Sequence, residues 1–253
     1  MKNIVDLTNK KILITGASSG IGAETALLCS QLGAKVILVA RREEKLREVL
    51  SGLEGSGHQF YSFDLANVDE IEAFIKKIVE EIGPLDGFVH SAGIPGTRPF
   101  KLYKPQALRA IMDVNFSSFF EIVRCISKKN ASNEGASIVG VSSISSKIGG
   151  LGKSGYSPSK AAMNGAVRCM AKELASRKIR VNTVCPGLIE TTIYQTIIDN
   201  SGDSQDTKAR IDRQYLGLGH PVDIANTIAF LLSDASRMIT GTSINVDGGM
   251  LSS

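Results

Sequence analysis

Short apolar runs alternate along the chain with longer segments in which apolar residues recur at helical spacing. The runs predict strands and the segments between them predict amphipathic helices. Strands are expected at residues 11–15, 35–40, 58–63, 85–90, 138–141, 179–184 and 242–247. Helices are expected from the turn after the first strand to about residue 32, from residue 43 onward, and at 68–82, 105–129, 156–174 and 221–232. The alternation predicts an α/β fold: a parallel sheet with helices on both faces.

One segment interrupts this alternation. Residues 188–219 are polar, only weakly patterned, and follow the strand expected at 179–184. An irregular excursion beyond a strand end is typical of a substrate lid. The sequence has no linker, internal repeat or low-complexity run, so we expect residues 1–253 to form a single dinucleotide-binding domain.

A glycine-rich turn follows the first predicted strand and leads into a helix. The turn reads Gly16-Ala-Ser18-Ser19-Gly20-Ile21-Gly22. Gly16 permits a sharp exit from the strand, Gly20 a close approach of phosphate, and Gly22 tight packing of helix on sheet. The helix N-terminus offers unpaired N–H groups to a pyrophosphate. The turn therefore predicts a dinucleotide site; the alternative is a loop with only a structural task.

The end of the second predicted strand bears on the choice of cofactor. An acidic residue there would bind the ribose hydroxyls of NAD, but the position holds Ala40. Arg41 and Arg42 follow, and a planar guanidinium suits a 2′-phosphate. These residues favour NADP(H) over NAD(H). The alternative is that both arginines only begin the charged helix that continues with Glu43.

Two further strand ends carry polar or small residues. Asp64 and Leu65 follow the third strand, where Asp64 is expected to receive the adenine amino group, to cap the helix over 68–82, or to do both. Ser91, Ala92 and Gly93 follow the fourth strand, where small side chains leave room for a cofactor close to the backbone. We expect these residues at the dinucleotide site.

Tyr156 and Lys160 stand four residues apart at the start of a predicted helix, so their side chains share one face. A nearby ammonium lowers the pKa of a phenol, which can then exchange a proton with a substrate oxygen. Ser143 follows a buried strand and offers a hydroxyl to the same oxygen. The alternative is a surface tyrosine beside a solvated lysine.

Asn115 lies in the apolar middle of the helix expected at 105–129. A buried asparagine needs hydrogen-bond partners. It is therefore either a satisfied polar group of the core or part of a proton path.

Composition excludes several other classes of protein. The 253 residues are 43% hydrophobic and 21% charged with a net charge of +4, as in a soluble globular domain. Basic residues form no stripe interleaved with aromatics, so no nucleic-acid partner is expected. No apolar run approaches the roughly 18 residues that cross a bilayer, and no signal-peptide pattern is present. Four widely spaced cysteines indicate buried thiols in a cytoplasmic protein rather than a metal site.

Together these residues resemble the short-chain dehydrogenase/reductase family over essentially the whole chain. The matching parts are the glycine motif, the tetrad of Asn115, Ser143, Tyr156 and Lys160, and Pro186-Gly187 with Thr191, all in order and spacing. The segments 239–242 and 245–249 look most like the 3-oxoacyl-acyl carrier protein reductase branch. The resemblance implies a Rossmann-type, doubly wound sheet of seven parallel strands in a homotetramer or homodimer.

The resemblance also implies a role for each member of the tetrad. Tyr156 is the general acid in carbonyl reduction, and Ser143 orients and polarises the carbonyl. Lys160 holds the nicotinamide ribose and lowers the pKa of Tyr156. Asn115 anchors a water that leads protons toward Lys160.

At the nicotinamide end of the cofactor, the resemblance implies contacts from Pro186, Gly187, the backbone of Ile189, and Thr191. Arg41 matches the basic residue that marks NADP(H)-preferring members of the family.

Three positions depart from the family pattern. Ser19 stands where some NADP-preferring members carry a basic residue, and His90 and Ser91 stand where a pair of asparagines is usual. Cofactor preference therefore rests on Arg41 and Arg42.

The leading hypothesis is an NADP(H)-dependent oxidoreductase that interconverts a carbonyl and a secondary alcohol of a small molecule, with Tyr156 as general acid/base. A 3-oxoacyl thioester or a similar ketone is the substrate that the resemblance favours. Two alternatives stay open. One is an NAD-linked sugar or polyol dehydrogenase; the other is a non-catalytic, cofactor-binding regulatory protein that has kept the fold.

Overall fold

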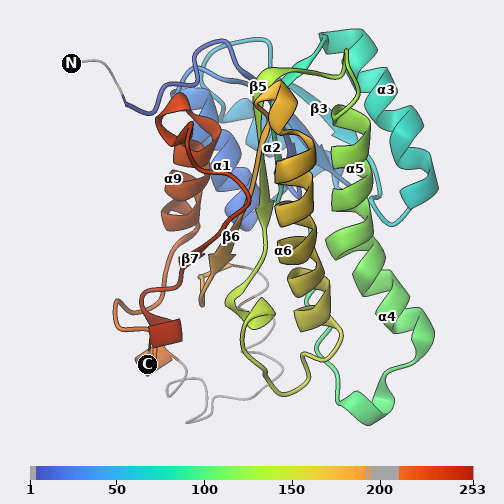
Figure 1. The fold of residues 1–253 in the computed structure, drawn as a ribbon, viewed down its shortest axis with the longest axis vertical. Helices are drawn as coiled ribbons and strands as arrows, with labels where there is room; N and C mark the ends of the chain where they lie inside the picture. The colour runs from blue at the N-terminus through green and yellow to red at the C-terminus, as the bar shows by residue number, and fades with distance from the viewer. Residues whose placement is uncertain (1–3, 192–193, 195–210, 253) are drawn as a thin grey trace.

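The computed structural model describes residues 4–191, 194 and 211–252. Its centre is a sheet with the strand order β3-β2-β1-β4-β5-β6-β7. The strands are β1 (Lys11–Thr15), β2 (Lys35–Ala40), β3 (Gln59–Ser62), β4 (Leu85–His90), β5 (Ser132–Val141), β6 (Arg180–Pro186) and β7 (Ser243–Val246). Every adjacent pair is parallel. The expected seven-stranded Rossmann-type sheet is confirmed (Figure 1).

Helices cover both faces of the sheet, as predicted. They are α1 (Gly20–Gln31), α2 (Glu43–Ser51), α3 (Ile71–Ile82), α4 (Pro105–Met112), α5 (Ser118–Ile126), α6 (Tyr156–Glu173) and α9 (Pro221–Leu232). One core lies between the sheet and α3, α5 and α6; the other lies between the sheet and α1, α2 and α9. In the described part of the chain, no helix is long and apolar enough to cross a membrane.

Each inner strand contributes to both cores because alternate residues of a strand point to opposite faces. In β1, Leu13 packs into the core under α3, α5 and α6. Its neighbours Ile12 and Ile14 pack into the core under α1, α2 and α9. All three side chains are fully buried. Burial on both faces explains why these strands appear in the sequence as continuous apolar runs.

The helix predicted over residues 105–129 is divided. Between α4 and α5 the chain makes a π-helical turn, Asp113–Ser117. Such turns re-aim side chains and are frequent at functional sites. Apolar periodicity does not reveal the turn, because one wider turn shifts the apolar stripe by only a fraction of the helix circumference.

The strand predicted at residues 138–141 is longer than expected: β5 begins at Ser132, within a segment whose composition is typical of a turn. Ser132 pairs with Leu85, but the next pair is Ser137 with Gly87, so the intervening residues form an irregularity in the strand. Gly135 adopts a φ of 78° there. The turn-forming composition of this segment produces a bulge within β5 rather than a break before it.

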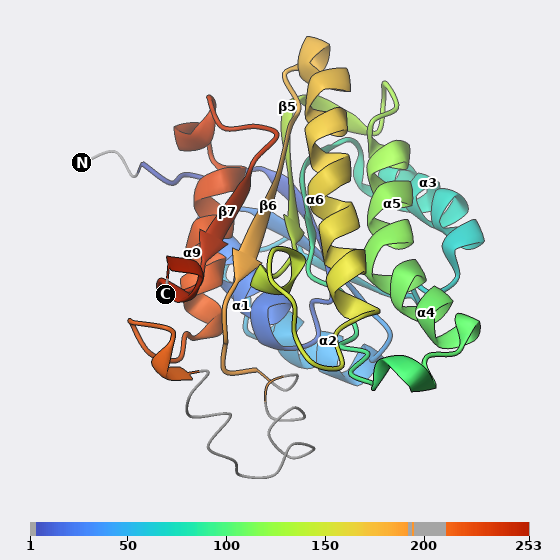
Figure 2. The ribbon, with the colours of Figure 1, turned by 60° about the horizontal axis from the view of Figure 1, so that its bottom comes forward.

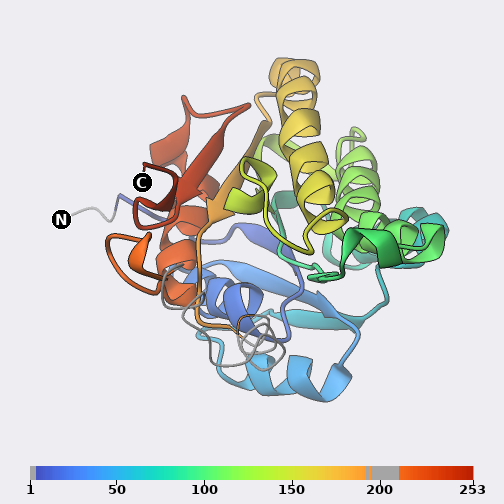
Figure 3. The same cartoon turned by 90° about the horizontal axis from the view of Figure 1, so that it is seen from below.

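The sheet order reverses between β1 and β4, which is the topological switch point at which α/β sheets bind ligands. Figure 2 turns forward the edge where the strands end, and the starts of α1 and α6 lie along it. Figure 3 views the molecule from that edge, with α1 and α2 on one side of the sheet and α5 and α6 on the other. Of the lid predicted at 188–219, residues 192–193 and 195–210 lie outside the described residues.

Candidate active site

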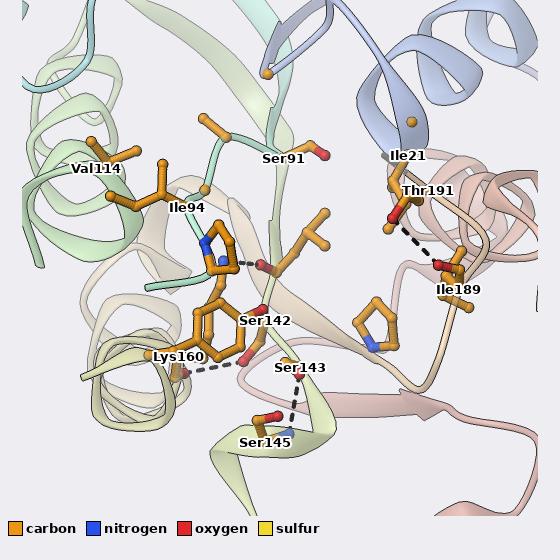
Figure 4. Close-up of a pocket in the computed structure, with 18 of the residues that line it drawn as sticks. Ile21, Ser91, Ile94, Val114, Ser142, Ser143, Ser145, Lys160, Ile189 and Thr191 are labelled. Atoms are coloured by element: carbon orange, nitrogen blue, oxygen red, sulfur yellow. Dashed lines mark hydrogen bonds between the residues drawn. The ribbon is translucent and has the colours of Figure 1, made fainter. Parts of the chain in front are cut away.

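A cavity of about 460 Å³ opens at the carboxyl ends of the strands (Figure 4). All but two of the residues predicted for the site line it. The lining residues among them are Gly16, Ser18, Ser19, Gly20, Ile21, Arg41, Arg42, Asp64, Leu65, Ser91, Ala92, Gly93, Ser143, Tyr156, Lys160, Pro186, Gly187, Ile189 and Thr191. The two exceptions, Gly22 and Asn115, lie just behind the cavity wall. The fold therefore gathers candidates from nearly the full length of the chain.

The glycine-rich turn from β1 to α1 forms one end of the cavity. Gly16 has a φ of 69°, and a Cβ there would lie 2.6 Å from the backbone nitrogen of Ala92. A Cβ on Gly22 would collide with the carbonyl oxygen of Gly16. The N-cap residue Ser19 makes no side-chain capping hydrogen bond to α1. The first N–H groups of α1 are therefore available, and the turn fits a pyrophosphate.

The two arginines after β2 have different partners. Arg42 reaches back to the glycine-rich turn, where its Nη2 donates to the hydroxyls of Ser18 and Ser19, each at 3.0 Å. Arg41 Nη1 lies 3.9 Å from Asp64 Oδ2. Although Ser19 is not itself basic, its hydroxyl holds the guanidinium of Arg42 beside the turn, so a positive charge is present there.

Asp64 does not cap the helix that follows it. Its Oδ1 accepts a hydrogen bond from the N–H of Ala66 at 3.1 Å, which closes a local turn. The 3₁₀ turn before α3 begins after Asn67, and α3 itself begins after Glu70. The capping alternative was therefore wrong, while the position of Asp64 on the cavity wall leaves its expected contact with adenine as a prediction.

The segment after β4 forms the floor of the cavity. A Cβ on Gly93 would lie 3.3 Å from Lys160 Nζ and 3.4 Å from Asn115 Oδ1, so glycine leaves room for both polar groups. His90 is fully buried beneath this segment, with Nδ1 3.0 Å from Thr15 Oγ1. Burial and the charge of Lys160 lower the pKa of His90 to about 3, so its imidazole is neutral at physiological pH.

Asn115 lies in the π-helical turn and is fully buried. Its Oδ1 accepts from the N–H of Ile94 at 2.8 Å. Its Nδ2 donates to the carbonyl of Ile94 at 3.1 Å and to Ser159 Oγ at 3.0 Å. The amide thus ties the floor segment to α6. These bonds agree with the interpretation of Asn115 as a satisfied core group, and the proton path stays a prediction.

Tyr156 begins α6 and Lys160 follows one helical turn later, as the spacing predicted. Lys160 is buried; its ammonium donates to the carbonyl of Val141 at 2.8 Å and lies 5.9 Å from the centroid of the Tyr156 ring. Ser143, at the end of β5, is hydrogen-bonded to the Tyr156 phenol. Three groups that can hold or move a proton therefore meet at one point of the cavity.

Burial shifts the pKa values of both Tyr156 and Lys160. Burial raises the pKa of Tyr156, and the hydrogen bond from Ser143 opposes this rise without reversing it. Burial of the phenol sets the direction, and a lowering of its pKa by Lys160 stays a prediction. Burial also lowers the pKa of Lys160, to about 8. Lys160 remains mostly protonated at neutral pH and titrates just above it.

The residues after β6 form the nicotinamide end that the sequence predicted. Thr191 Oγ1 donates to the carbonyl of Ile189 at 3.3 Å, and a Cβ on Gly20 would touch the Thr191 methyl group at 3.4 Å. The described ends of the predicted lid meet here, since the N–H of Glu190 donates to the carbonyl of Gly219 at 2.8 Å. This end of the cavity therefore lies against the glycine-rich turn.

Sequence reasoning missed two residues near this site. Gln214 is buried and accepts from the N–H of Leu188 at 2.9 Å, which ties the returning chain to the end of β6. Lys153 is 7% exposed and lines the cavity, with its ammonium 5.4 Å from the centroid of the Tyr156 ring. Neither Gln214 nor Lys153 lies in a predicted strand or helix. The only sequence signal for Lys153 was its position three residues before Tyr156.

Comparisons with known proteins agree with this geometry. The family model described as enoyl-(acyl carrier protein) reductase matches residues 16–251. The 3-oxoacyl-(acyl-carrier-protein) reductase of Thermotoga maritima is 34% identical over 247 residues, which are 97% of this chain and 99% of that protein. The enzyme of the same name from Vibrio cholerae is 34% identical over 246 residues, with the same coverage.

Solved structures with bound cofactor are also similar. A short-chain dehydrogenase from Burkholderia cenocepacia in complex with NADP has a TM-score of 0.88 and 28% identity, covering 97% of this chain and 99% of that one. A variant of actinorhodin polyketide ketoreductase with NADPH has a TM-score of 0.87 and 29% identity, covering 96% and 97%.

Proposed function

The chain belongs to the short-chain dehydrogenase/reductase family of oxidoreductases, in the 3-oxoacyl-acyl carrier protein reductase-like branch, and we propose that it reduces a ketone to a secondary alcohol with NADPH. One observation carries the proposal. Ser143, Tyr156 and Lys160 converge on a cavity whose other end is the glycine-rich turn. A regulatory protein that only bound a cofactor would not need this convergence of proton-exchanging groups.

The chain's own groups have distinct tasks in the proposed reaction. Ser143 and Tyr156 donate hydrogen bonds to the substrate oxygen and fix the carbonyl for attack. As the carbonyl carbon gains a hydride, negative charge develops on its oxygen, and Tyr156 transfers its phenolic proton there. The protonated Lys160 stabilises the phenolate that remains. One hydride and one proton thus convert the C=O bond to CH–OH.

The residues at the other end of the cavity fit a dinucleotide. Bound NADPH supplies the hydride, and the protein supplies position and electrostatics. We assign the pyrophosphate to the glycine-rich turn and the start of α1, and the adenine to the side of the cavity with Asp64 and Leu65. The 2′-phosphate is assigned to Arg42, Ser18 and Ser19, together with Arg41, because these donors cluster beside Ala40, whose side chain has no carboxylate to repel an anion.

A 3-oxoacyl thioester is one candidate substrate because the similar reductases carry that name. The apolar lining from Ile94, Ile144 and Ile148 supports a ketone with a short apolar part. An NAD-linked polyol dehydrogenase is less consistent with the site, since Ala40 leaves the ribose hydroxyls without a carboxylate. A homodimer or homotetramer in the cytoplasm remains part of the proposal.

Titration of the purified protein with NADPH and with NADH, followed by fluorescence, tests the cofactor assignment. We expect tight binding of NADPH and weak binding of NADH, followed by NADPH oxidation in the presence of a ketone. Tighter binding of NADH than of NADPH would favour the NAD-linked polyol dehydrogenase over the NADPH-dependent reductase. Binding without turnover on a broad panel of ketones would favour a regulatory protein.

A further inference from the structure

Asn164 lies eight residues after Tyr156 in α6 and has no task in the reaction proposed above. We propose that Asn164 is a positioning residue: its side-chain amide fixes Ser143 beside Tyr156 by holding the hydroxyl of Ser146. The inference rests on the proposed function, because it concerns how the hydrogen-bond donor to the substrate oxygen is kept in place.

Asn164 extends the polar face of α6 by one turn. Residues four positions apart in a helix lie one above the other, so Tyr156, Lys160 and Asn164 share a face. Further along the same face, Val167 is fully buried in the apolar core between the sheet and α3, α5 and α6. Asn164 is itself only 8% exposed, and a buried amide is costly unless its polar atoms are hydrogen-bonded. Its partners therefore indicate its task.

Each polar atom of the Asn164 side chain has a partner. Its Oδ1 accepts a hydrogen bond from Thr183 Oγ1 in β6 at 2.8 Å. Its Nδ2 donates to Ser146 Oγ at 2.8 Å and to the Cys185 sulfur, near the end of β6, at 3.7 Å. Ser146 belongs to the 3₁₀ turn Ile144–Ser146, which follows β5 directly after Ser143. The amide is therefore anchored on β6 and holds this turn.

Ser146 transmits this constraint to the backbone of Ser143. The Ser146 hydroxyl donates its single proton to the carbonyl of Ser143 at 2.5 Å and accepts the N–H of Asn164 on a lone pair. The backbone N–H of Ser146 donates to the same carbonyl at 3.0 Å. Two hydrogen bonds thus fix the Ser143 carbonyl, and Asn164 holds the donor of one of them.

The side chain of Ser143 is oriented by the same turn. Its Oγ accepts a hydrogen bond from the N–H of Ser145 at 3.1 Å (Figure 4). The hydroxyl proton is then directed to the Tyr156 phenol, to which Ser143 is hydrogen-bonded. A displacement of a catalytic group by about 1 Å can cost roughly 100-fold in rate. Asn164 should therefore affect kcat although it does not line the cavity.

The test compares Asn164→Ala and Ser146→Ala with the parent protein in NADPH oxidation by a reducible ketone. Each single change should lower kcat about tenfold to 100-fold, because Ser143 loses its fixed position. The KM for NADPH should change little, since the glycine-rich turn is untouched. The double variant should lose no more than the more affected single variant, because both changes break the same chain of hydrogen bonds.

Asn182→Ala is the matched control. Asn182 is a fully buried asparagine of β6 whose amide bonds the carbonyl of Ile239 at 2.9 Å and the N–H of Thr242 at 3.2 Å. None of these three residues lines the cavity. Asn182→Ala should therefore be destabilised in urea about as much as Asn164→Ala but keep the parental kcat.

Three results would overturn the inference. They are a parental kcat in Asn164→Ala, losses that multiply in the double variant, and an equal loss of kcat in Asn182→Ala. If Asn164→Ala does not fold, Ser146→Ala carries the test, because it removes the hydroxyl that connects Asn164 to Ser143. A parental kcat in Ser146→Ala would then reject the inference.

Hydrogen exchange separates this inference from the proposed function. Exchange of the backbone N–H groups in residues 142–150 is measured by mass spectrometry without substrate, for the parent, Asn164→Ala and Asn182→Ala. Faster exchange in Asn164→Ala alone would support the anchor even if the parent reduces no ketone, in which case only the proposed reduction would fail. Equal exchange in the parent and Asn164→Ala would reject the anchor whatever the activity.

Discussion

The two ends of the cavity are built in different ways. In the glycine-rich turn, residues 16–22, a Cβ on Gly16 would lie 2.6 Å from the backbone of Ala92, so the backbone itself defines the site. In the loop before α6, residues 142–155, the glycines differ: a Cβ on Gly149 would meet nothing within 4 Å, whereas a Cβ on Gly155 would lie 2.7 Å from the ring of Tyr103. There the site is defined by the side chains of Ser143 and Lys153.

A substitution should therefore act differently at the two ends of the cavity. A backbone cradle tolerates few residues, because any side chain fills the space that the ligand needs. A loop position with open space, such as Gly149, tolerates many residues, and each of them presents a different group to the substrate. We therefore expect the cofactor end to be damaged by added atoms and the substrate end to be altered by exchanged functional groups.

The largest expected effect is at the substrate end. Tyr156→Phe removes the proton donor but keeps the ring, and should lower kcat about 1000-fold. Binding of NADPH should change little, because the glycine-rich turn is untouched. The measurement is NADPH oxidation with a reducible ketone alongside a fluorescence titration. Turnover within tenfold of the parent would remove Tyr156 from the proposed role.

The matching change at the cofactor end is Gly16→Ala. The added Cβ would press on Ala92 and force an alanine to a φ of 69°, which should destabilise the fold by at least about 2 kcal/mol and weaken NADPH binding. Gly165→Ala is the control, since a Cβ there meets nothing within 4 Å and α6 gains a better helix former. Urea unfolding of both variants measures the difference. Equal free energies of unfolding for Gly16→Ala and Gly165→Ala would show that the turn can relax around an added Cβ. The backbone of the turn would then not define the cofactor end of the cavity.

These contrasts explain which parts the sequence made predictable. The seven strands and the glycine-rich turn were predictable because apolar runs and glycine spacing follow directly from burial and backbone sterics. The juxtaposition of Tyr156 and Lys160 was predictable from spacing because the two residues share one helix face. The π-helical turn at Asp113–Ser117 was not, because no periodicity marks a single wider turn.

Contacts between residues far apart in the sequence were also not predictable. The bonds from Arg42 to Ser18 and Ser19 and from Gln214 to Leu188 join residues at least 23 positions apart in the sequence. No local pattern reveals such pairs, since they depend on how the elements pack. Lys153 was missed for the same reason: only the folded chain shows that it is buried beside Tyr156.

A smaller effect is expected where a side chain supports the cofactor end. Arg42→Ala removes the guanidinium that Ser18 and Ser19 hold, and should weaken NADPH binding about tenfold to 100-fold while leaving NADH binding nearly unchanged. Arg47→Ala, which removes an exposed arginine from α2, serves as the control. Equal losses for NADPH and NADH would reject the 2′-phosphate assignment. A larger effect from Arg41→Ala would make Arg41 the main selector.

The smallest expected effect lies between the two ends, at His90. Its pKa is lowered from 6.5 to about 3 by burial and by Lys160, so between these pH values the unfolded chain binds a proton that the native protein does not. The free energy of unfolding should therefore fall as the pH drops through this window. His90→Asn removes that contribution and should flatten the dependence, measured as the shift in urea midpoint between neutral pH and a pH inside the window. His220→Asn, at an exposed histidine, should keep the parental dependence. If His90→Asn keeps it too, the buried imidazole is not the group that makes stability depend on pH in this window.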